Sequence, residues 1–565
     1  MKKISRRDFL KGMAAGAAGI AGYGLISNVS VAANAESSTS AVSPNPDWLG
    51  EAPVIADSDI AETWDTDLLI VGAGNGGMVA AAKAADLGLN FRIIEQMSIV
   101  SDSRDFFGAV NSKYTLEAGC KVDYAKLLGE LSRYASGKCD QRVIKVWMDE
   151  SADMIDYIAG ILDQYGYDVV FEPDTGVETS GTQYYCSPQQ HTAAARPDSE
   201  YAGVGRNKLL QDYIEKKGYS IDFNTSLVEL LKENGSITGV IAQSDSKYIR
   251  INAKAVILAT GGYAGNPEMM MARNPLASKL MAVNFNYLPD KGQGHKAALW
   301  AGAAMDIEPA AMMFDRGAIK PGVDAGFVQN EKGDWILPGG AITTMTEYNP
   351  GSQPFLKVSR NGDRFANESC PYNDILFAAS HLPGRVYCQV YDANFKEDWQ
   401  RFHTLGCSSV SRLIPDIMGM LIEGKVEEGV VMKADTLEEL ADKLGFEGEA
   451  KETFLATVAR YNELYDAQED VDFGKPAYRL SEIRTAPFYG VWLAGNILTT
   501  GDGICINTKM QALDEEQNVI PGLYCIGDVS GSFFANNYPE LCPGTACGRT
   551  MTFALKAVNT IAETL

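Results

Sequence analysis

The sequence predicts an α/β protein in which a Rossmann-like nucleotide-binding domain carries a second, α+β domain as an insertion. Three observations support this fold class. A βαβ fingerprint lies at residues 66–96, and a continuous apolar run at 255–259 is typical of a buried parallel strand. The composition becomes more polar over about 346–485, and strand signals return afterwards. A chain of 565 residues is long enough for both domains.

The fingerprint has its parts in the order that a dinucleotide site requires. An apolar strand at 67–71 leads into a glycine-rich turn, a helix at 78–87 follows, and a second strand at 90–94 ends at Glu95. The turn consists of Gly72, Ala73, Gly74, Asn75, Gly76 and Gly77. A pyrophosphate would lie at the helix N-terminus, where N–H groups and the macrodipole favour an anion.

The glycines of this turn have separate roles. Gly72 permits the tight turn, Gly74 lets the backbone approach a pyrophosphate, and Gly77 lets the helix pack closely on the strand. Glu95, 21 residues after Gly74, is placed to accept hydrogen bonds from ribose hydroxyls. A glycine-rich turn without a ligand is the alternative, and the surrounding strand, helix and acid favour the nucleotide site.

The N-terminus resembles a twin-arginine export signal. Residues 5–11 read Ser-Arg-Arg-Asp-Phe-Leu-Lys, a Gly/Ala-rich segment follows, and residues 33–35 supply a small-residue cleavage site. We therefore expect a signal peptide at 1–35, a flexible linker at 36–61, and export to the periplasm or the exterior of the cell envelope. The segment is weakly apolar for a membrane span, so an uncleaved anchor is the less favoured alternative.

Charge and cysteine spacing exclude several classes of protein. The formal net charge of −24 argues against nucleic acid and anionic lipid as partners, and is compatible with docking a basic electron-transfer protein. No two of the ten cysteines have C-x-x-C spacing, and four histidines are few for a histidine-rich site, so we expect no metal. Cysteines 505, 525, 542 and 547 are interpreted as buried apolar residues, with a cluster or a disulfide left open.

Periodicity predicts the remaining elements in order. The helices expected before the insertion are 122–166, 209–217 and 294–301, those within it are 435–444 and 450–468, and the final one is 546–565. The strands expected are 226–233, 237–243, 248–251, 255–259, 503–507 and 522–528. A second glycine turn, Thr260, Gly261 and Gly262, follows the apolar strand at 255–259 and could also bring backbone close to a ligand.

Four separated motifs together resemble the flavoprotein family of fumarate reductase and succinate dehydrogenase, the FAD-dependent oxidoreductase 2 family. They are the glycine turn with Glu95, the run 259–262, the run 361–368 and the run 523–528. The chain looks most like soluble periplasmic flavin reductases and 3-ketosteroid dehydrogenases, from about residue 64 to the C-terminus. The resemblance implies an extended FAD, held by an FAD-binding domain at 62–345 and 486–565, under a mobile cap at 346–485.

The same resemblance implies residue roles at the cofactor. Asp528 would bind a ribityl hydroxyl, and the Thr260 turn would lie near the dinucleotide. Membrane-bound relatives attach FAD to a histidine in a His-Thr pair soon after the fingerprint, where this chain has Ser-Asp-Ser-Arg at 101–104. The pair His191-Thr192 is too far downstream, so we expect non-covalent FAD.

The chain departs from the fumarate reductases at their substrate anchors. Thr499 stands where the family has a dicarboxylate-binding histidine, and Lys396 stands where a cap arginine donates a proton. The loop at 536–544 replaces a family arginine and resembles the Tyr-Pro-Gly-Pro-Gly loop of 3-ketosteroid dehydrogenases. That likeness implies that Tyr538 and the Gly544 N–H polarise a substrate carbonyl. Packing of Tyr538 on the flavin ring is the alternative.

Three more charged residues have roles that the sequence leaves open. In the family the glutamate that corresponds to Glu368 belongs to a proton-delivery chain, which Arg364 and Lys396 could extend. Arg364 and Glu368 could instead be an ion pair at the start of the cap. Arg549 could pair with a substrate carboxylate, a flavin oxygen or Glu540.

These expectations combine into one functional hypothesis. We expect an exported FAD-dependent oxidoreductase, fumarate-reductase-like, that reduces a C=C bond conjugated to a carbonyl or carboxylate in a small molecule other than fumarate. Electrons would come from a membrane-anchored cytochrome or quinol-linked donor, as in anaerobic respiration. The alternatives are a 3-ketosteroid-type dehydrogenase running in the oxidative direction, and a flavin-binding electron carrier. The inserted cap argues against a carrier, because a carrier has no need to exclude water from a cavity.

Overall fold

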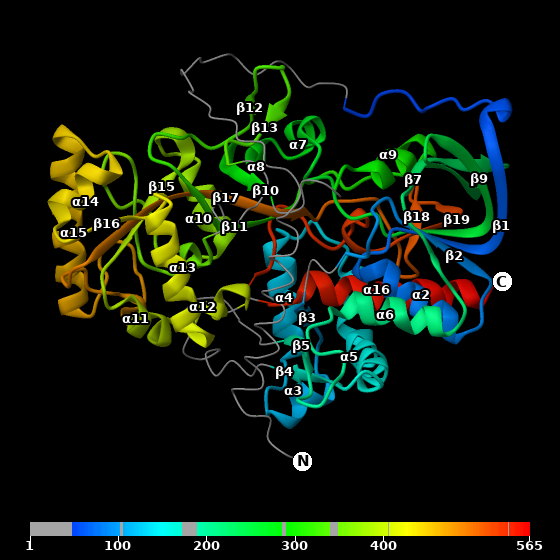
Figure 1. The fold of residues 1–565 in the computed structure, drawn as a ribbon, viewed down its shortest axis with the longest axis horizontal. Coiled ribbons are helices and arrows are strands. Elements are labelled where there is room, and N and C mark those ends of the chain that lie inside the picture. Colours follow the sequence, from blue (N-terminus) through cyan, green and yellow to red (C-terminus); the bar gives the residue numbers. More distant parts are fainter. Residues whose placement is uncertain are drawn as a thin grey trace.

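The computed structural model describes residues 48–101, 105–171, 189–284, 290–339, 348–404, 406–540 and 542–565. They form two large sheets, one of eight strands and one of six. Figure 1 shows the eight-stranded sheet at one end of the molecule and the six-stranded sheet at the other. The long strand β17 (Phe488–Thr500) runs from the six-stranded sheet toward the centre.

The eight-stranded sheet has a parallel core in the order β19-β9-β1-β2-β6. Leu68–Val71 of β1 pair in parallel with Ala255–Leu258 of β9, and β19 pairs with the same end of β9. Parallel pairing and the burial of residues 255–258 confirm the strand that the apolar run at 255–259 predicted, and the strand ends one residue earlier, at Leu258. The predicted strands 248–251 and 255–259 are one continuous strand, β9.

The bounds of this domain's strands are β1 (Ile60–Val71), β2 (Phe91–Ile94), β6 (Ile221–Asp222), β7 (Thr225–Glu233), β8 (Ser236–Ser244), β9 (Lys247–Leu258), β18 (Gln511–Leu513) and β19 (Val519–Cys525). Its helices include α2 (Asn75–Asp86), α4 (Tyr124–Tyr134), α5 (Gln141–Asp163), α6 (Arg206–Lys216), α9 (Gln293–Trp300) and α16 (Thr545–Ala562). Figure 1 shows α2, α6 and α16 together on one side of the sheet. The predicted segment 122–166 is two helices, and residues 503–507 make isolated bridges instead of a strand.

Close packing explains why two glycines of the fingerprint turn must be glycines. Gly72 has φ +105°, and a Cβ there would lie 2.5 Å from the Ala259 carbonyl oxygen. A Cβ on Gly77 would lie 1.7 Å from the Gly72 carbonyl oxygen. The close approach at Gly72 lets the end of β1 pack against the end of β9, and the close approach at Gly77 lets α2 pack directly on the turn.

The six-stranded sheet is built around β17, all thirteen residues of which are buried. β10 (Met281–Asn284), β11 (Ala311–Ile319), β15 (Tyr387–Tyr391) and β16 (Met432–Ala434) all pair with it, and β14 (Leu356–Val358) pairs with β15. The sheet therefore takes strands from both sides of the region 346–485, and the domain boundaries given above stay predictions. Helices that flank it include α10 (Tyr372–Ala379), α11 (Phe395–Phe402), α13 (Pro415–Glu427), α14 (Leu437–Leu444) and α15 (Gly448–Ala467).

The fold class agrees with the prediction from sequence. A Rossmann-like parallel sheet is joined by a mainly antiparallel second sheet, in which Ala311 at the start of β11 pairs with Thr500 at the end of β17. None of the helices in the described part of the chain is long and apolar enough to cross a membrane.

Candidate functional site

The N-terminus of α2 forms the pyrophosphate end of the site. Gly74 is the N-cap of this helix, and a Cβ built on it would meet nothing within 4 Å. The backbone is therefore open to close approach at the position where the fingerprint requires it. The Gly74 carbonyl accepts the first helical hydrogen bond from the Met78 N–H at 2.9 Å.

Glu95 joins the end of β2 to the same turn. Its two carboxylate oxygens accept hydrogen bonds from the N–H groups of Ala73 at 2.6 Å and Met97 at 2.8 Å. Burial raises the pKa of Glu95, and these two backbone donors oppose that effect. The carboxylate is thus fixed beside the turn, where the fingerprint places a ribose acceptor.

Arg206 and Asn207 at the start of α6 bind the turn from another side. Arg206 Nη2 and Asn207 Nδ2 both donate to Asn75 Oδ1, at 2.7 and 2.8 Å. Arg206 is 4% exposed, and its guanidinium also lies over the ring of Phe107. The predicted helix at 209–217 began after these residues, so sequence reasoning missed them.

Thr260 presents a buried hydroxyl to the site. Among the described residues its Oγ1 has no hydrogen-bond partner. The neighbouring Gly294 is constrained by it, because a Cβ there would lie 2.0 Å from Thr260 Oγ1. Gly261 has φ +73°, and a Cβ on Gly262 would lie 2.6 Å from the hydroxyls of Thr499 and Thr500. An orphaned buried hydroxyl beside a tight glycine turn fits a ligand that supplies the missing partner.

Asp528 and Asp290 converge on one hydroxyl at the end of β17. Thr499 Oγ1 lies 3.1 Å from Asp290 Oδ2 and 3.1 Å from Asp528 Oδ2. Arg549 Nη2 lies 3.6 Å from the other oxygen of Asp528 and donates to the Gly527 carbonyl at 2.8 Å. Of the partners considered for Arg549, the structure thus places it beside Asp528 and not beside Glu540. The Glu540 carboxylate instead accepts a hydrogen bond from the Tyr372 N–H.

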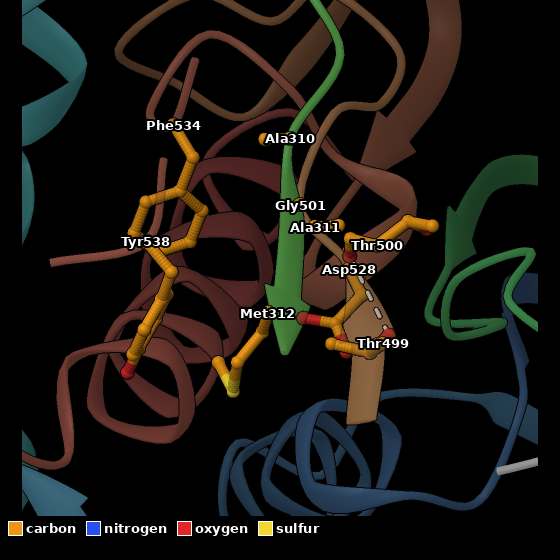
Figure 2. Close-up of a pocket in the computed structure, with 9 residues that line it drawn as sticks. All are labelled: Ala310, Ala311, Met312, Thr499, Thr500, Gly501, Asp528, Phe534 and Tyr538. Carbon is orange, nitrogen blue, oxygen red and sulfur yellow. Dashed lines mark hydrogen bonds between the residues drawn. The ribbon is translucent and has the colours of Figure 1, made fainter. Parts of the chain in front are cut away.

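A small pocket lies where these groups approach β11 and the C-terminal loop. One part of its wall consists of Thr499 and Thr500 at the end of β17, the following Gly501, and Asp528 in the 3-10 turn Gly527–Val529. Its other walls, from the segment that enters β11 and from the C-terminal loop, are Ala310, Ala311, Met312, Phe534 and Tyr538. Figure 2 shows Phe534 and Tyr538 on one side of β11, and Asp528 with Thr499 on the other.

Tyr538 contributes its ring to the pocket, and its hydroxyl contacts a helix N-terminus. The hydroxyl accepts a hydrogen bond from the Ala546 N–H at 3.2 Å, in the first turn of α16. In Figure 2 the hydroxyl is at the end of the side chain farthest from Asp528. Gly544 is the N-cap of α16, with φ +81°, and its carbonyl accepts from the Gly108 N–H at 2.8 Å. Tyr538 and Gly544 thus both lie at the start of α16.

Two asparagines connect the Tyr538 loop to β11. Asn373 on α10 donates to the Ala311 carbonyl at 2.9 Å and accepts from the Met313 N–H at 3.1 Å. It also donates to Asn537 Oδ1 at 2.7 Å, and the same oxygen accepts from the Tyr538 N–H at 2.8 Å. The walls of the pocket on both sides of Met312 are therefore held by one side-chain network.

Arg364 and Glu368 form the core of a buried ionic network in the region 346–485. Arg364 donates to both oxygens of Glu368 at 2.8 Å and to Asp470 at 3.0 and 2.7 Å. Lys475 Nζ lies 3.3 Å from Glu368 and donates to the Tyr461 hydroxyl at 2.5 Å. Burial lowers the pKa of Lys475 to about 7, against the opposing attraction of Glu368. The structure thus adds Asp470 and Lys475 to the predicted pair.

Lys396 lies apart from this network. It is on α11, its side chain is 42% exposed, and its Nζ is 2.9 Å from the carboxylate of Asp416, which is 90% exposed. In the described part of the chain no contact joins Lys396 to Glu368 or to the pocket of Figure 2. An ion pair this exposed contributes little to stability.

His191 and the cysteines occupy structural positions. His191 Nε2 lies 2.7 Å from Ser112 Oγ and Nδ1 lies 2.7 Å from the Gln189 carbonyl, and burial lowers the His191 pKa to about 4. Cysteines 525, 542 and 547 are buried, as predicted, whereas Cys505 is only partly buried, so the prediction was wrong for that residue. Among the described residues no group of three or more His, Cys, Asp and Glu side chains could hold a metal ion.

Comparison with known proteins identifies two segments. Residues 67–541 match the family described as FAD binding domain, and residues 3–21 match the twin-arginine translocation pathway signal sequence. The vinyl phenol reductase of Lactiplantibacillus plantarum is 26% identical, over 85% of this chain and 93% of that protein. The cytochrome-type fumarate reductase of Shewanella frigidimarina is 26% identical, over 87% of this chain and 75% of that protein.

Two solved structures share the fold. The open conformation of a flavocytochrome c3 fumarate reductase superimposes with a TM-score of 0.63 at 21% identity, over 90% of this chain and 79% of that one. The 3-ketosteroid delta1-dehydrogenase from Sterolibacterium denitrificans gives a TM-score of 0.66 at 19% identity, over 89% of this chain and 100% of that one. Both likenesses confirm the predicted architecture.

Proposed function

We propose, from the premise that this chain belongs to the FAD binding domain family, that it reduces a C=C bond conjugated to a carbonyl or carboxylate. The chain is an FAD-dependent oxidoreductase, and its twin-arginine signal directs export to the periplasm or cell envelope, as the sequence predicted. The observation that carries the proposal is the pocket in which Asp528, from the cofactor side, and Tyr538, from the C-terminal loop, form opposite walls.

The residues around the glycine turn fit FAD. Asn75, Gly76 and Gly77 would face the pyrophosphate, Glu95 the adenosine ribose, and Asp528 a ribityl hydroxyl. The orphaned Thr260 hydroxyl would gain its missing partner from the same cofactor. We propose that FAD is held without a covalent bond, because His191 is hydrogen-bonded on both ring nitrogens within the protein.

Tyr538 is the proposed donor to the substrate carbonyl oxygen. A hydroxyl that accepts a hydrogen bond at a helix N-terminus is polarised toward donating its own proton. A donor aimed at a developing enolate oxygen can contribute a few kcal/mol to transition-state stabilisation. The Gly544 N–H is the proposed second donor. Tyr538 would need to turn its hydroxyl from Ala546 toward the pocket as substrate binds.

The reduction also needs a hydride and a proton. FAD, when bound and reduced, supplies the hydride to one carbon of the double bond. We propose that Glu368, Arg364 and Lys475 supply the proton for the other carbon, because Lys475 has a pKa near neutrality and contacts Glu368. A fixed ion pair at the start of the cap is the alternative. The exposed position of Lys396 does not support a role for it as a direct proton donor.

The electron source is also part of the proposal. An exported flavoprotein whose sequence lacks a haem-attachment motif needs an external electron donor, and a membrane-anchored cytochrome or a quinol-linked protein meets that need. Oxidation of a ketone is the second candidate function, favoured by the similarity of the loop at 536–544 to that of 3-ketosteroid dehydrogenases. A flavin-binding electron carrier is the third.

An anaerobic reoxidation screen tests these functions. The holoenzyme is reduced with dithionite or viologen, and unsaturated carboxylates, aryl enoates and enones are added singly. We expect rapid reoxidation of the flavin by at least one conjugated compound and slow reoxidation by fumarate. Rapid reoxidation by fumarate would contradict the interpretation of Thr499 and the Tyr538 loop. Reduction of the oxidised enzyme by saturated ketones would favour the dehydrogenase. If no compound reacts in either direction, the result would favour the electron carrier.

A further inference from the structure

The loop that carries Tyr538 is bound by a helix from a much earlier part of the sequence. Asn537, which directly precedes Tyr538, makes side-chain hydrogen bonds with Asn373 and Asp374 in the first turn of α10. We propose that Asn537 is a positioning residue through which α10 sets the orientation of Tyr538. The inference rests on the proposed function, in which Tyr538 donates a hydrogen bond to the substrate carbonyl.

The side-chain amide of Asn537 has one orientation that satisfies all its partners. Its Nδ2 donates to Asp374 Oδ1 at 2.8 Å, and its Oδ1 accepts from Asn373 Nδ2 at 2.7 Å and from the Tyr538 N–H at 2.8 Å. A backbone N–H only donates, and an ionised carboxylate only accepts. Reversing the amide would therefore place donor against donor at Tyr538 and acceptor against acceptor at Asp374.

Asn373 connects this amide to β11. Its Oδ1 accepts from the Met313 N–H at 3.1 Å, and its Nδ2 donates to the Ala311 carbonyl at 2.9 Å as well as to the loop. These backbone groups flank Met312, which lines the same pocket as Tyr538. Helix α10 also packs against β11 (Figure 1). Asn373 therefore fixes the loop relative to the strand on which Met312 lies.

A second contact holds the Tyr538 backbone from its carbonyl side. The Glu540 N–H donates to the Tyr538 carbonyl at 2.9 Å, and the Glu540 carboxylate accepts from the Tyr372 N–H at the start of α10. Both backbone polar groups of Tyr538 are thus hydrogen-bonded to residues that α10 holds. Rotation of the Tyr538 side chain remains possible, and this rotation would turn its hydroxyl from Ala546 toward the pocket.

A fixed backbone lowers the cost of orienting a donor. Because the Tyr538 backbone is held before substrate binds, less conformational freedom is lost when the hydroxyl is directed at the carbonyl. A displacement of about 1 Å at a reacting group can lower a rate about 10²-fold. The alternative is that these hydrogen bonds only stabilise the fold. The two explanations differ in whether the effect of Asn537 depends on the Tyr538 hydroxyl.

Exchanging the side chains at 537 and 374 tests the contact between them. In Asn537→Asp two carboxylates would face each other, and their repulsion should displace the loop. We expect the rate of flavin reoxidation at saturating substrate to fall about tenfold or more, with a smaller change in KM. Adding Asp374→Asn puts a donor opposite the new carboxylate, so the rate should return to within about threefold of wild type. Measurements are made at about pH 8, because burial raises the pKa of Asp374.

Asn518 and Asp514 provide a matched control pair on the surface. Asn518 Nδ2 donates to Asp514 Oδ2 at 3.3 Å in the exposed turn between β18 and β19. Asn518→Asp should leave the rate unchanged. Asn537→Ala removes the same side-chain hydrogen bonds without adding a charge and should also slow reoxidation, which keeps the test available if Asn537→Asp does not fold. FAD content and melting temperature are measured for every variant.

The Tyr538→Phe background separates positioning from stability. With the hydroxyl absent, Asn537→Ala should lower the rate by less than about twofold, while it lowers the melting temperature as much as it does in the wild type. The same loss of rate with and without the hydroxyl would show that Asn537 acts on the fold or the cofactor, and would overturn the inference. A rate that Asp374→Asn does not restore in Asn537→Asp would overturn it as well.

Turnover by the wild type separates this inference from the proposed function. If no conjugated carbonyl compound reoxidises the wild-type flavin, the proposed function fails and the inference fails with it. If the wild type and Asn537→Ala react at the same rate, the inference alone fails. Hydrogen exchange is independent of turnover: the backbone amides of 536–544 should exchange about tenfold faster in Asn537→Ala. Unchanged exchange in this loop would also overturn the inference.

Discussion

Arg206 and Asn75 are 131 residues apart in the sequence, and Arg206 Nη2 donates a hydrogen bond to Asn75 Oδ1 at 2.7 Å. Asn207 donates to the same oxygen at 2.8 Å. Two donors on one amide oxygen fix the orientation of the Asn75 side chain, so its NH₂ group is directed away from them. Asn75 is the first residue of α2, which makes this NH₂ group an additional donor at the pyrophosphate end of the site.

Replacement of Arg206 should therefore weaken FAD binding. Arg206→Gln removes a buried positive charge beside the pyrophosphate end and one of the two donors that orient Asn75. A hydrogen bond from a charged group contributes about 1.5–3 kcal/mol, so the Kd for FAD should rise about tenfold or more. Titration of the apoprotein with FAD measures it. Arg142→Gln, at an 82% exposed arginine, is the control, and equal Kd values in the two variants would contradict the assignment.

Thr260→Val separates a role in FAD binding from a role in folding. The Thr260 hydroxyl is buried without a partner among the described residues, so its removal should leave the melting temperature of the apoprotein unchanged or slightly higher. The Kd for FAD should rise about fivefold, the scale of one hydrogen bond. Thr115→Val is the matched control, because the Thr115 hydroxyl is buried and bonded to Ser112. It should lower stability and leave FAD affinity unchanged. An unaltered Kd in Thr260→Val would remove Thr260 from the cofactor site.

Local signals predicted the nucleotide-binding half of the fold well. The run at 255–259 is continuously apolar because both faces of β9 are covered there, and Gly72 and Gly77 are glycines because a Cβ would collide with backbone. Such constraints act within a few residues and leave a direct mark on the sequence. The prediction of a strand at 503–507 was wrong, because pairing there depends on distant segments. Met305 and Ser530 meet this segment only at isolated bridges.

Most of the candidate site depends on contacts between distant segments. Asn373 touches Ala311, Met313 and Asn537, and no local pattern distinguishes it from a surface asparagine. The same holds for Asp290, which reaches Thr499 across 209 residues. Lys396 illustrates the converse, because a family position suggested a proton donor and the structure places the side chain in an exposed ion pair.

Asp306 should make stability depend on pH in a defined window. Burial raises the pKa of its carboxyl from 3.8 to about 7; the N–H groups of Ser532 and Gly503 oppose this, and the charge of Asp502 adds to it. The folded state therefore holds a proton that the unfolded state releases above pH 3.8. This stabilising contribution is complete below about pH 4 and is lost as the pH rises to about 7.

Asp306→Asn removes that titration and keeps the shape of the side chain. The melting temperature of the wild type relative to the variant should fall between pH 4 and pH 7 and stay constant above, with a change of a few kcal/mol in the free energy of unfolding. Thermal melts of both proteins across this range provide the comparison, and titrating groups that do not interact with Asp306 cancel in the difference. A difference that does not change with pH would show that Asp306 is ionised throughout.

Tyr538→Phe tests the chemistry of the pocket. The ring that lines the pocket is retained and one hydroxyl is lost, so FAD affinity should be unchanged. Reoxidation of the reduced flavin by a conjugated enone should slow roughly 10²-fold or more, the scale of one transition-state donor. Stopped-flow absorbance under anaerobic conditions measures the rate at saturating substrate, which separates the chemical step from binding.

Phe534→Leu is the control for this variant, because it changes the neighbouring wall of the pocket without removing a hydrogen-bond donor. It should alter the KM for an aryl enone more than the rate at saturation, since Phe534 contributes contact area and no proton. The Ala546 N–H loses its acceptor in Tyr538→Phe, so the melting temperature of both variants is measured as well. An unchanged rate in Tyr538→Phe would remove the hydroxyl from the mechanism and leave Tyr538 as an aromatic wall that packs against the bound cofactor.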